Sequence, residues 1–265
     1  MSGAALAVAV GSILAWKWEL GVRRSALTVL ALATAIAAAI SATGMPPVLT
    51  GICVFFGSLA VCALIVLWRF FRDPERVPPG ESDIVISPAD GTVIYVKHSA
   101  AGVLPGSTKR GHELSLEELV RTRLSFDDAI VIGIALSFLD VHVNRAAIDG
   151  EVTLQRRFAG QFMSLKLPDA IVRNERSTTV IRNESLEVAI VLIASRLVRR
   201  IVSLVREGEC VALGQRIGVI RFGSQVDLVL PLRPDLRVLI APGDRVVAGT
   251  SVVAALGATP GTPSG

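Results

Sequence analysis

Apolar residues dominate the N-terminal end of the chain, where two long stretches carry no charge. The first is Ala26–Thr43, which is rich in alanine, and the second is the more hydrophobic Val48–Trp68. A helix needs about 20 apolar residues to cross the hydrocarbon core of a bilayer, so the second stretch qualifies easily and the first is only marginally hydrophobic. Gly44-Met45-Pro46-Pro47 separates them and favours a tight turn. The pattern predicts a helical hairpin; the alternative is one spanning helix and one helix lying in the interface.

Basic residues flank this hairpin on both sides. Arg23 and Arg24 precede it, Arg69, Arg72 and Arg76 follow it, and the turn has no charge. Positive charge near membrane helices marks the cytoplasmic side. We therefore expect both ends of the hairpin, and the domain that follows, on the cytoplasmic side of the cell (inner) membrane.

Beyond a charged, proline-rich segment at 72–80, short β-branched runs alternate with turn signals. This spacing is typical of a mostly β domain. One helix is predicted at Ser115–Arg123, with Ser115 as N-cap and Glu118 at the capping-box position. The runs are Ile84–Ile86, Thr92–Val96, Ala129–Leu136, Val188–Ile193, Val226–Leu230 and Arg237–Ile240. We expect residues 1–69 to form a helical membrane anchor and residues 70–265 a mostly β domain with few helices.

A short repeat supports this fold class. Glu207–Gly214 and Pro242–Gly249 each place a glycine and an acidic residue in a turn, then a valine, then a second glycine. The pattern resembles the hairpins of lipoyl and biotinyl carrier domains, which are flattened β-barrels, and it predicts a barrel-like domain. A carrier normally displays a modifiable lysine at a hairpin tip, and no lysine follows Lys166.

Composition narrows the function classes. The net charge is +4, but aromatic residues make up only 5% of the chain and no basic stripe alternates with them. A cationic surface facing anionic lipid explains the charge better than nucleic-acid binding. The three cysteines form no CxxC pair and no Cys/His cluster, so neither a disulfide framework nor a metal site is indicated.

Four segments carry a resemblance to one family. In chain order they are Phe70–Arg76, Ser87–Gly91, Asp140–Arg145 and Arg221–Leu228, the last of which contains Gly223-Ser224. Together they resemble the phosphatidylserine decarboxylases, in the short, type II-like prokaryotic form. These enzymes cleave their own Gly-Ser bond and convert the serine into a pyruvoyl group. The resemblance implies cleavage between Gly223 and Ser224 into two fragments that stay associated, and it leaves homo-oligomerisation open.

The implied chemistry suits the residues at this bond. Loss of CO₂ from an amino acid leaves a carbanion that no ordinary side chain can delocalise, so an electrophilic carbonyl must form an imine with the substrate amine. Gly223 has no Cβ to obstruct attack by the Ser224 hydroxyl. The resemblance implies conversion of phosphatidylserine to phosphatidylethanolamine, with the phospholipid and its membrane as partners and the pyruvoyl group as covalent cofactor.

A serine activated in this way needs a base. His98 and His112 flank an expected loop, whereas His142 ends an apolar run; its structural alternative is a strand-end histidine. The resemblance implies that Asp90 orients this base or activates Ser224, although an Asx turn would also explain an aspartate there. Whether His142 serves both self-cleavage and the later proton transfer is open.

Further candidates are proposed for substrate binding: Asn144, Arg145, Asn174, Glu175 and Arg176. The planar fork of Arg145 suits a phosphate or carboxylate, and it stands where long relatives carry a second histidine. Asn174-Glu175-Arg176 resembles a family stretch near the substrate pocket, and a polar turn is an equal alternative. Residues 99–127 look like an insertion relative to short relatives, with no assigned role.

Two other functions remain as alternatives. An archaeal-type decarboxylase acting on a serine-bearing ether lipid would use the same headgroup chemistry. A non-catalytic, membrane-tethered β-barrel adaptor would use the lipoyl-like hairpins without cleaving itself.

Overall fold

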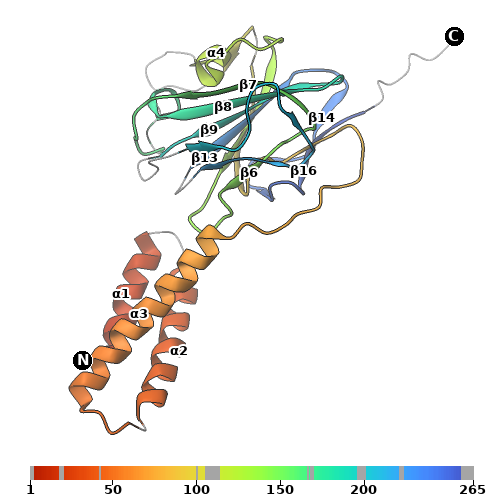
Figure 1. Ribbon diagram of the computed structural model, residues 1–265. Coiled ribbons are helices and arrows are strands. Elements are labelled where there is room, and N and C mark those ends of the chain that lie inside the picture. Colours follow the sequence, from red (N-terminus) through yellow and green to blue (C-terminus); the bar gives the residue numbers. More distant parts are fainter. Residues whose placement is uncertain are drawn as a thin grey trace, which may run out of the picture. The chain divides into compact units, whose positions relative to one another are not determined.

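The computed structural model describes residues 3–17, 21–41, 43–99, 101–104, 114–165, 167, 170–195, 201–220 and 224–257. The chain forms two compact units, which Figure 1 shows as a group of helices and a β-sheet domain. The helical unit contains Met1–Arg72 with Phe138–Asp140, and the β unit contains Asp73–Ser137 and Val141–Gly265.

Three helices make up most of the helical unit: α1 (Gly3–Lys17), α2 (Val22–Ser41) and α3 (Pro47–Phe71). By length and composition, α2 and α3 could each cross a membrane. Both predicted helices are therefore present with shifted ends, since α2 begins before Ala26 and α3 runs on to Phe71. Pro47 stands at the start of α3, where its fixed φ suits a helix and its missing N–H costs nothing.

Small residues let these helices approach one another closely. A methyl group added at Gly3 on α1 would overlap the carbonyl oxygen of Gly51 on α3. Ala7 and Ala33 have no exposed surface. Small residues of this kind are common at the interfaces of membrane helices, where backbone contact replaces the hydrophobic effect.

The β unit is built on an eight-stranded antiparallel sheet in the order β11-β7-β8-β9-β13-β5-β2-β15. Figure 1 shows the strands β7, β8, β9 and β13 side by side in a curled layer. The strands are β2 (Gly91–His98), β5 (Ala129–Ala135), β7 (Gly150–Phe158), β8 (Arg176–Arg182), β9 (Glu187–Ile193), β11 (Cys210–Val211), β13 (Gln225–Pro231) and β15 (Arg245–Val246).

Smaller sheets and two short helices complete this unit. The sheets are β1-β16-β14, β10-β12-β6 and β3-β4. Their strands are β1 (Ile84–Ile86), β3 (Val103–Leu104), β4 (Leu114–Ser115), β6 (Val143–Arg145), β10 (Ile201–Ser203), β12 (Arg216–Ile220), β14 (Leu236–Val238) and β16 (Val252–Leu256), and the helices are α4 (Leu116–Val120) and α5 (Ala170–Arg173). The prediction of a mostly β, barrel-like domain with few helices is confirmed.

The central strand β13 is buried on both faces, so it lacks the polar alternation of a half-exposed strand. On one face Val226, Leu228 and Leu230 belong to the larger core. On the other face Val229 belongs to a smaller core that also holds Leu119 of α4. Successive side chains of a strand point to opposite faces, which separates the two cores.

The repeat seen in the sequence forms the two edge strands of the large sheet. β15 pairs with the start of β2 at one end, and β11 pairs with the start of β7 at the other. The hydrogen bonds match: Val93 N–H donates to the Asp244 carbonyl, and Val152 N–H donates to the Glu209 carbonyl, both at 2.9 Å. Each strand starts at an Asp-Gly pair, which we call the first corner (Asp90-Gly91) and the second corner (Asp149-Gly150).

The helix predicted at Ser115–Arg123 is shorter than expected. Ser115 and Glu118 form the predicted capping box, but the helix ends at Val120. Arg121 takes a left-handed conformation with φ 60°, and Arg176 of β8 donates hydrogen bonds to the carbonyls of Glu118 and Leu119. A long-range partner for the last carbonyls therefore ends α4 where local propensity would have continued it.

Candidate active site

Ser224 lies directly before β13 and is only 2% exposed. The Leu136 N–H donates to its carbonyl oxygen at 2.9 Å, so the backbone here continues the sheet. Among the residues that the structure describes, nothing hydrogen-bonds its hydroxyl oxygen. Buried hydroxyls are normally paired, so this one fits a functional group better than a structural one. Gly223, the other half of the predicted cleavage site, lies outside the described residues.

His142 is 3% exposed and stands directly before β6. Its carbonyl accepts a hydrogen bond from the Ile220 N–H at 3.1 Å. Ile220 is the last residue of β12, only four positions before Ser224 in the sequence. The pairing of β6 with β12 therefore places the backbone of the histidine beside the end of β12.

Asp90 occupies the first corner and is 7% exposed. Arg76 binds it through both terminal nitrogens of its guanidinium group, with Nη1 to Oδ1 at 2.5 Å and Nη2 to Oδ2 at 2.9 Å. Two backbone N–H groups also donate to it, Ala248 at 2.8 Å and Val141 at 3.4 Å. The contact with Val141 places the carboxylate beside the backbone that enters His142.

Arg145 and Asn144 of β6 differ in how fully they are used. The Arg145 guanidinium donates to the carbonyls of Gly214 at 2.9 Å and Pro74 at 3.0 Å. Burial lowers its pKa, and the neighbouring Arg216 guanidinium adds to that effect. Asn144 is fully buried and donates weakly to the Pro88 carbonyl at 3.4 Å, while its Oδ1 has no partner in the described part of the chain.

Asn174, Glu175 and Arg176 lie at the same end of the sheet as Ser224. Arg176 pairs with Ile193 of β9, and Ile193 pairs with Gln225 of β13. With strands about 4.8 Å apart, this places the backbone of Arg176 about 10 Å from the residue after Ser224. The structure thus places the motif at the same end of the strands as the predicted cleavage site.

Each side chain of this motif nevertheless has a protein partner. Asn174 exchanges hydrogen bonds with the backbone of Met163 and donates to the Ala194 carbonyl. Glu175 forms an ion pair with Arg157. Arg176 holds the end of α4, and its burial lowers its pKa to about 10. These contacts give Asn174 a structural role, because it ties two backbone segments together.

A second polar cluster, which the sequence did not indicate, lies on the other face of β13. Asp227 is fully buried and accepts hydrogen bonds from the Tyr95 hydroxyl at 2.8 Å and the Gln225 amide at 2.7 Å. Its Oδ2 has no partner among the residues described. Burial raises its pKa to about 6, while Arg176 and Lys97 oppose that shift. Gly133 makes room for the Tyr95 ring, which a methyl group there would overlap.

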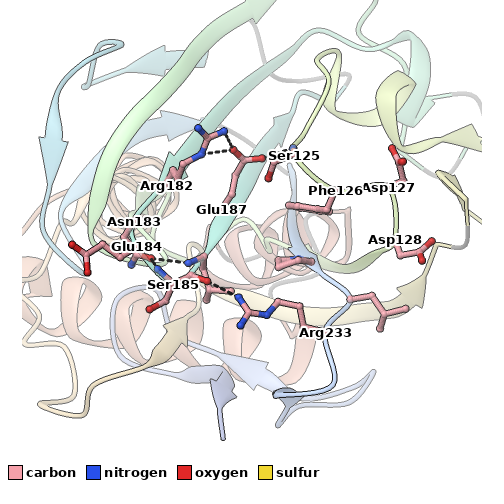
Figure 2. Close-up of a pocket in the computed structure, with 13 residues that line it drawn as sticks. Ser125, Phe126, Asp127, Asp128, Arg182, Asn183, Glu184, Ser185, Glu187 and Arg233 are labelled. Atoms are coloured by element: carbon pink, nitrogen blue, oxygen red, sulfur yellow. Dashed lines mark hydrogen bonds and ion pairs between the residues drawn. The ribbon is translucent and has the colours of Figure 1, made fainter. Parts of the chain in front are cut away.

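A cavity of about 590 Å³ lies elsewhere in the β unit, as Figure 2 shows. Pro231 lines it, so it lies at the end of β13 opposite to Ser224, about 20 Å away along the strand. Three of the charged side chains that line it form ion pairs, Arg182 with Glu187 and Arg233 with Asp235. The cavity is therefore separate from the candidate active site. Among the described residues, no group of His, Cys, Asp and Glu side chains could hold a metal ion.

Comparison with known proteins identifies the family. Residues 64–254 match the family model for phosphatidylserine decarboxylase. A phosphatidylserine decarboxylase proenzyme of Saccharopolyspora erythraea is 42% identical over 188 residues, covering 71% of this chain and 72% of the relative. One from Azorhizobium caulinodans is 37% identical, covering 80% and 83%.

An archaeal relative is similar to the same degree. A Methanocaldococcus jannaschii protein named "Putative archaetidylserine decarboxylase proenzyme" is 38% identical, covering 75% of this chain and 94% of the relative. The matches place the chain among the decarboxylases, a class of lyases. The chain belongs to the phosphatidylserine decarboxylase family.

Proposed function

We propose that this chain decarboxylates the serine headgroup of phosphatidylserine, giving phosphatidylethanolamine, after cleaving itself between Gly223 and Ser224. The observation that carries the proposal is the buried Ser224 hydroxyl, which has no hydrogen-bond partner among the described residues and follows a glycine. Family membership supports the same reaction. It also disfavours the non-catalytic adaptor considered above.

Self-cleavage would use the chain's own groups. The Ser224 oxygen attacks the Gly223 carbonyl carbon and gives up its proton to a base. The peptide C–N bond breaks, its nitrogen takes a proton, and an ester remains. Loss of the Ser224 α-proton then forms a Cα–Cβ double bond and expels the Gly223 carboxylate. Water adds to the resulting dehydroalanine tautomer and releases ammonia.

The residues present fit the pyruvoyl group that this sequence of bond changes leaves on residue 224. Its carbonyl supplies the electron sink that amino-acid decarboxylation needs. We assign to His142 the transfer of protons at the Ser224 hydroxyl and at the substrate α-carbon. Asp90 would orient the backbone that carries His142, through its contact with the Val141 N–H.

Among the candidates for substrate binding, Asn144 is the strongest. Its buried Oδ1 is an acceptor without a partner among the described residues, and an ammonium group of the substrate could donate to it. Arg145 already donates to the carbonyls of Gly214 and Pro74, so we assign it to holding the site together. Asn174, Glu175 and Arg176 would shape the nearby edge of the sheet.

The two fragments would stay associated because β13 is a central strand. It pairs with β5 on one side and β9 on the other, so backbone hydrogen bonds hold the small fragment within the sheet. The helices α2 and α3 would anchor the protein in the membrane, with both ends of the hairpin on the cytoplasmic side, as the flanking arginines predict.

Intact mass spectrometry of the purified full-length protein tests the proposal. The wild type should appear as two pieces, the smaller beginning at residue 224 with a pyruvoyl end that resists Edman degradation. Ser224→Ala should remain one inactive chain, while Ser185→Ala, which changes an exposed serine, should cleave normally. An uncleaved wild type, or decarboxylation by Ser224→Ala, would exclude the proposal.

Vesicles decide between the two lipid classes. The archaeal relative motivates the test, because it matches this chain about as well as the bacterial relatives do. Cleaved protein is given diacyl or diether phosphoserine lipid in otherwise identical vesicles, and released CO₂ is measured. We expect faster turnover of the diacyl lipid; a preference for the ether lipid would favour the archaeal-type activity.

A further inference from the structure

We propose that Arg76 is a positioning residue for self-cleavage, an inference that rests on the function proposed above. Arg76 belongs to the segment Asp73–Arg76, with which the β unit begins directly after the helical unit. In this proposal the docked segment holds Asp90, and Asp90 holds the backbone of His142. The segment is then a working part of the active site rather than a passive linker.

The first step of the argument is that the Asp90 carboxylate is saturated with donors. A carboxylate offers about four lone-pair sites, and four N–H groups occupy them here: two from Arg76 and one each from Ala248 and Val141. A carboxylate occupied in this way is poorly suited to take a proton from Ser224. Its geometry suits orientation of neighbouring groups instead.

The second step is that Arg76 cannot easily be replaced in this contact. The side chains of Arg76 and Asp90 are only 9% and 10% exposed. Arg76 also donates to the Ala248 carbonyl at 2.7 Å, so it links the carboxylate to the segment that follows β15. A planar fork makes two parallel bonds to a carboxylate, whereas lysine offers a single point charge.

The third step is that the rest of the segment docks on the strands that flank the site. Asp73 contacts Arg145 of β6 and Arg216 of β12, at 3.4 and 2.6 Å. Glu75 pairs with Arg216 at 2.6 Å, and that hydrogen bond lowers the pKa of Glu75. β6 follows His142 and β12 leads toward Ser224. The segment therefore bridges the strand that follows His142 and the strand that ends four residues before Ser224.

The second corner provides an internal reference. Asp149 stands before Gly150 as Asp90 stands before Gly91, at the start of a strand that pairs in the same way. Asp149 is exposed, and its carboxylate accepts a hydrogen bond from the side-chain amide of Asn183 at 3.3 Å. The corner therefore forms without a buried arginine, which indicates that Arg76 serves the chemistry at the first corner rather than the turn itself.

The test measures the rate of self-cleavage in full-length variants made in membranes, by following the two fragments with time. Arg76→Ala should slow cleavage at least tenfold, and Arg76→Lys should slow it several-fold while unfolding at nearly the wild-type temperature. Methylguanidine should accelerate cleavage of Arg76→Ala but not of Ser224→Ala, because it can refill the place of the lost guanidinium. Arg156→Ala, which removes an exposed arginine of β7, is the matched control and should cleave at the wild-type rate.

Each outcome either supports or contradicts the positioning role of Arg76. Wild-type cleavage rates in folded Arg76→Ala or Arg76→Lys would overturn the proposal, as would a lack of response of folded Arg76→Ala to methylguanidine. If Arg76→Ala fails to fold, Arg76→Lys alone decides. An uncleaved wild-type chain would instead contradict the proposed function, so the two failures can be told apart.

Discussion

The two Asp-Gly corners of the β unit place the same backbone form in two different environments. Each starts a long strand, each lies beside a short edge strand, and at both glycines a methyl group would overlap a carbonyl oxygen, that of Ala135 or of Arg182. The aspartates differ. Asp90 is buried against Arg76, whereas Asp149 is exposed. The turn accounts for the Asp-Gly pair at both corners, whereas the role proposed for Asp90 depends on its buried surroundings.

The largest difference between the corners should follow from removing one negative charge at each. Asp90→Asn leaves the buried Arg76 without its counter-charge, and breaking a buried ion pair costs about 3–5 kcal/mol. We expect cleavage to be lost and the unfolding temperature to fall. Asp149→Asn should change stability by less than about 0.5 kcal/mol and leave cleavage unchanged. Fragment analysis and thermal unfolding in detergent check this; equal effects at both corners would remove the distinction.

Alanine at the two glycines separates the fold from the chemistry. Gly91→Ala and Gly150→Ala each force a methyl group against a backbone carbonyl, and overpacking of this kind costs about 1–3 kcal/mol. We expect similar losses of stability from denaturant unfolding. Cleavage should slow only in Gly91→Ala, because the displaced backbone carries Asp90. If Gly150→Ala slows cleavage equally, the whole sheet rather than the first corner controls the site.

Asp227 extends the comparison to a buried carboxylate that, among the described residues, accepts no hydrogen bond from an arginine. Burial raises its pKa from 3.8 to about 6. The folded chain then binds the proton of the Asp227 carboxyl group more tightly than the unfolded chain does. The contribution of this bound proton to the free energy of unfolding is therefore full below about pH 4 and is lost as pH rises through 6. A shift of about two pKa units corresponds to about 3 kcal/mol.

Asp227→Asn should therefore gain stability relative to the wild type as pH rises from 4 to 7. Asn can still accept from Tyr95 and Gln225 through its amide oxygen. The charged groups that face Asp227 are Lys97 and Arg176, and the substitution leaves both in place. Unfolding temperatures of both proteins across the range provide the measurement. A difference that does not vary with pH would show that Asp227 does not titrate there.

The smallest effect is expected at the exposed part of the docked segment. Glu75→Gln removes a pair with Arg216 in which the Glu75 side chain is 83% exposed. Exposed ion pairs contribute little because water and salt screen them. Cleavage should slow at most a few-fold, and added salt should make the wild type behave like the variant. A loss as large as that of Arg76→Ala would mean that docking of the whole segment, not the Asp90 contact, limits cleavage.

Local signals in the sequence were enough for several elements. The apolar stretches predicted α2 and α3 because crossing a bilayer demands length and hydrophobicity that a short window reveals. The Ser115 and Glu118 pair predicted the capping box because its two partners are three residues apart. The runs Ile84–Ile86 and Val226–Leu230 predicted strands because a short run of β-branched and other apolar residues is itself a local signal. Ser224, His142 and Asp90 came from motifs, and their roles remain proposals.

The contacts that define the site could not be predicted in this way. Nothing near Arg76 in the sequence indicates that it binds Asp90, and Tyr95 meets Asp227 only because β2 and β13 both pair with β5. Arg145 looked suited to a phosphate, yet its fork is directed at main-chain carbonyls.

The amino-acid order by itself thus determined the two long apolar helices, the capping box and several strands, and it marked the serine on which the family chemistry would depend. Only the tertiary structure decided which aspartate is buried beside an arginine and which is left in water. The reason is physical: strand and helix signals act between near neighbours, whereas the environment of a charge depends on strand register and on segments far apart in the chain.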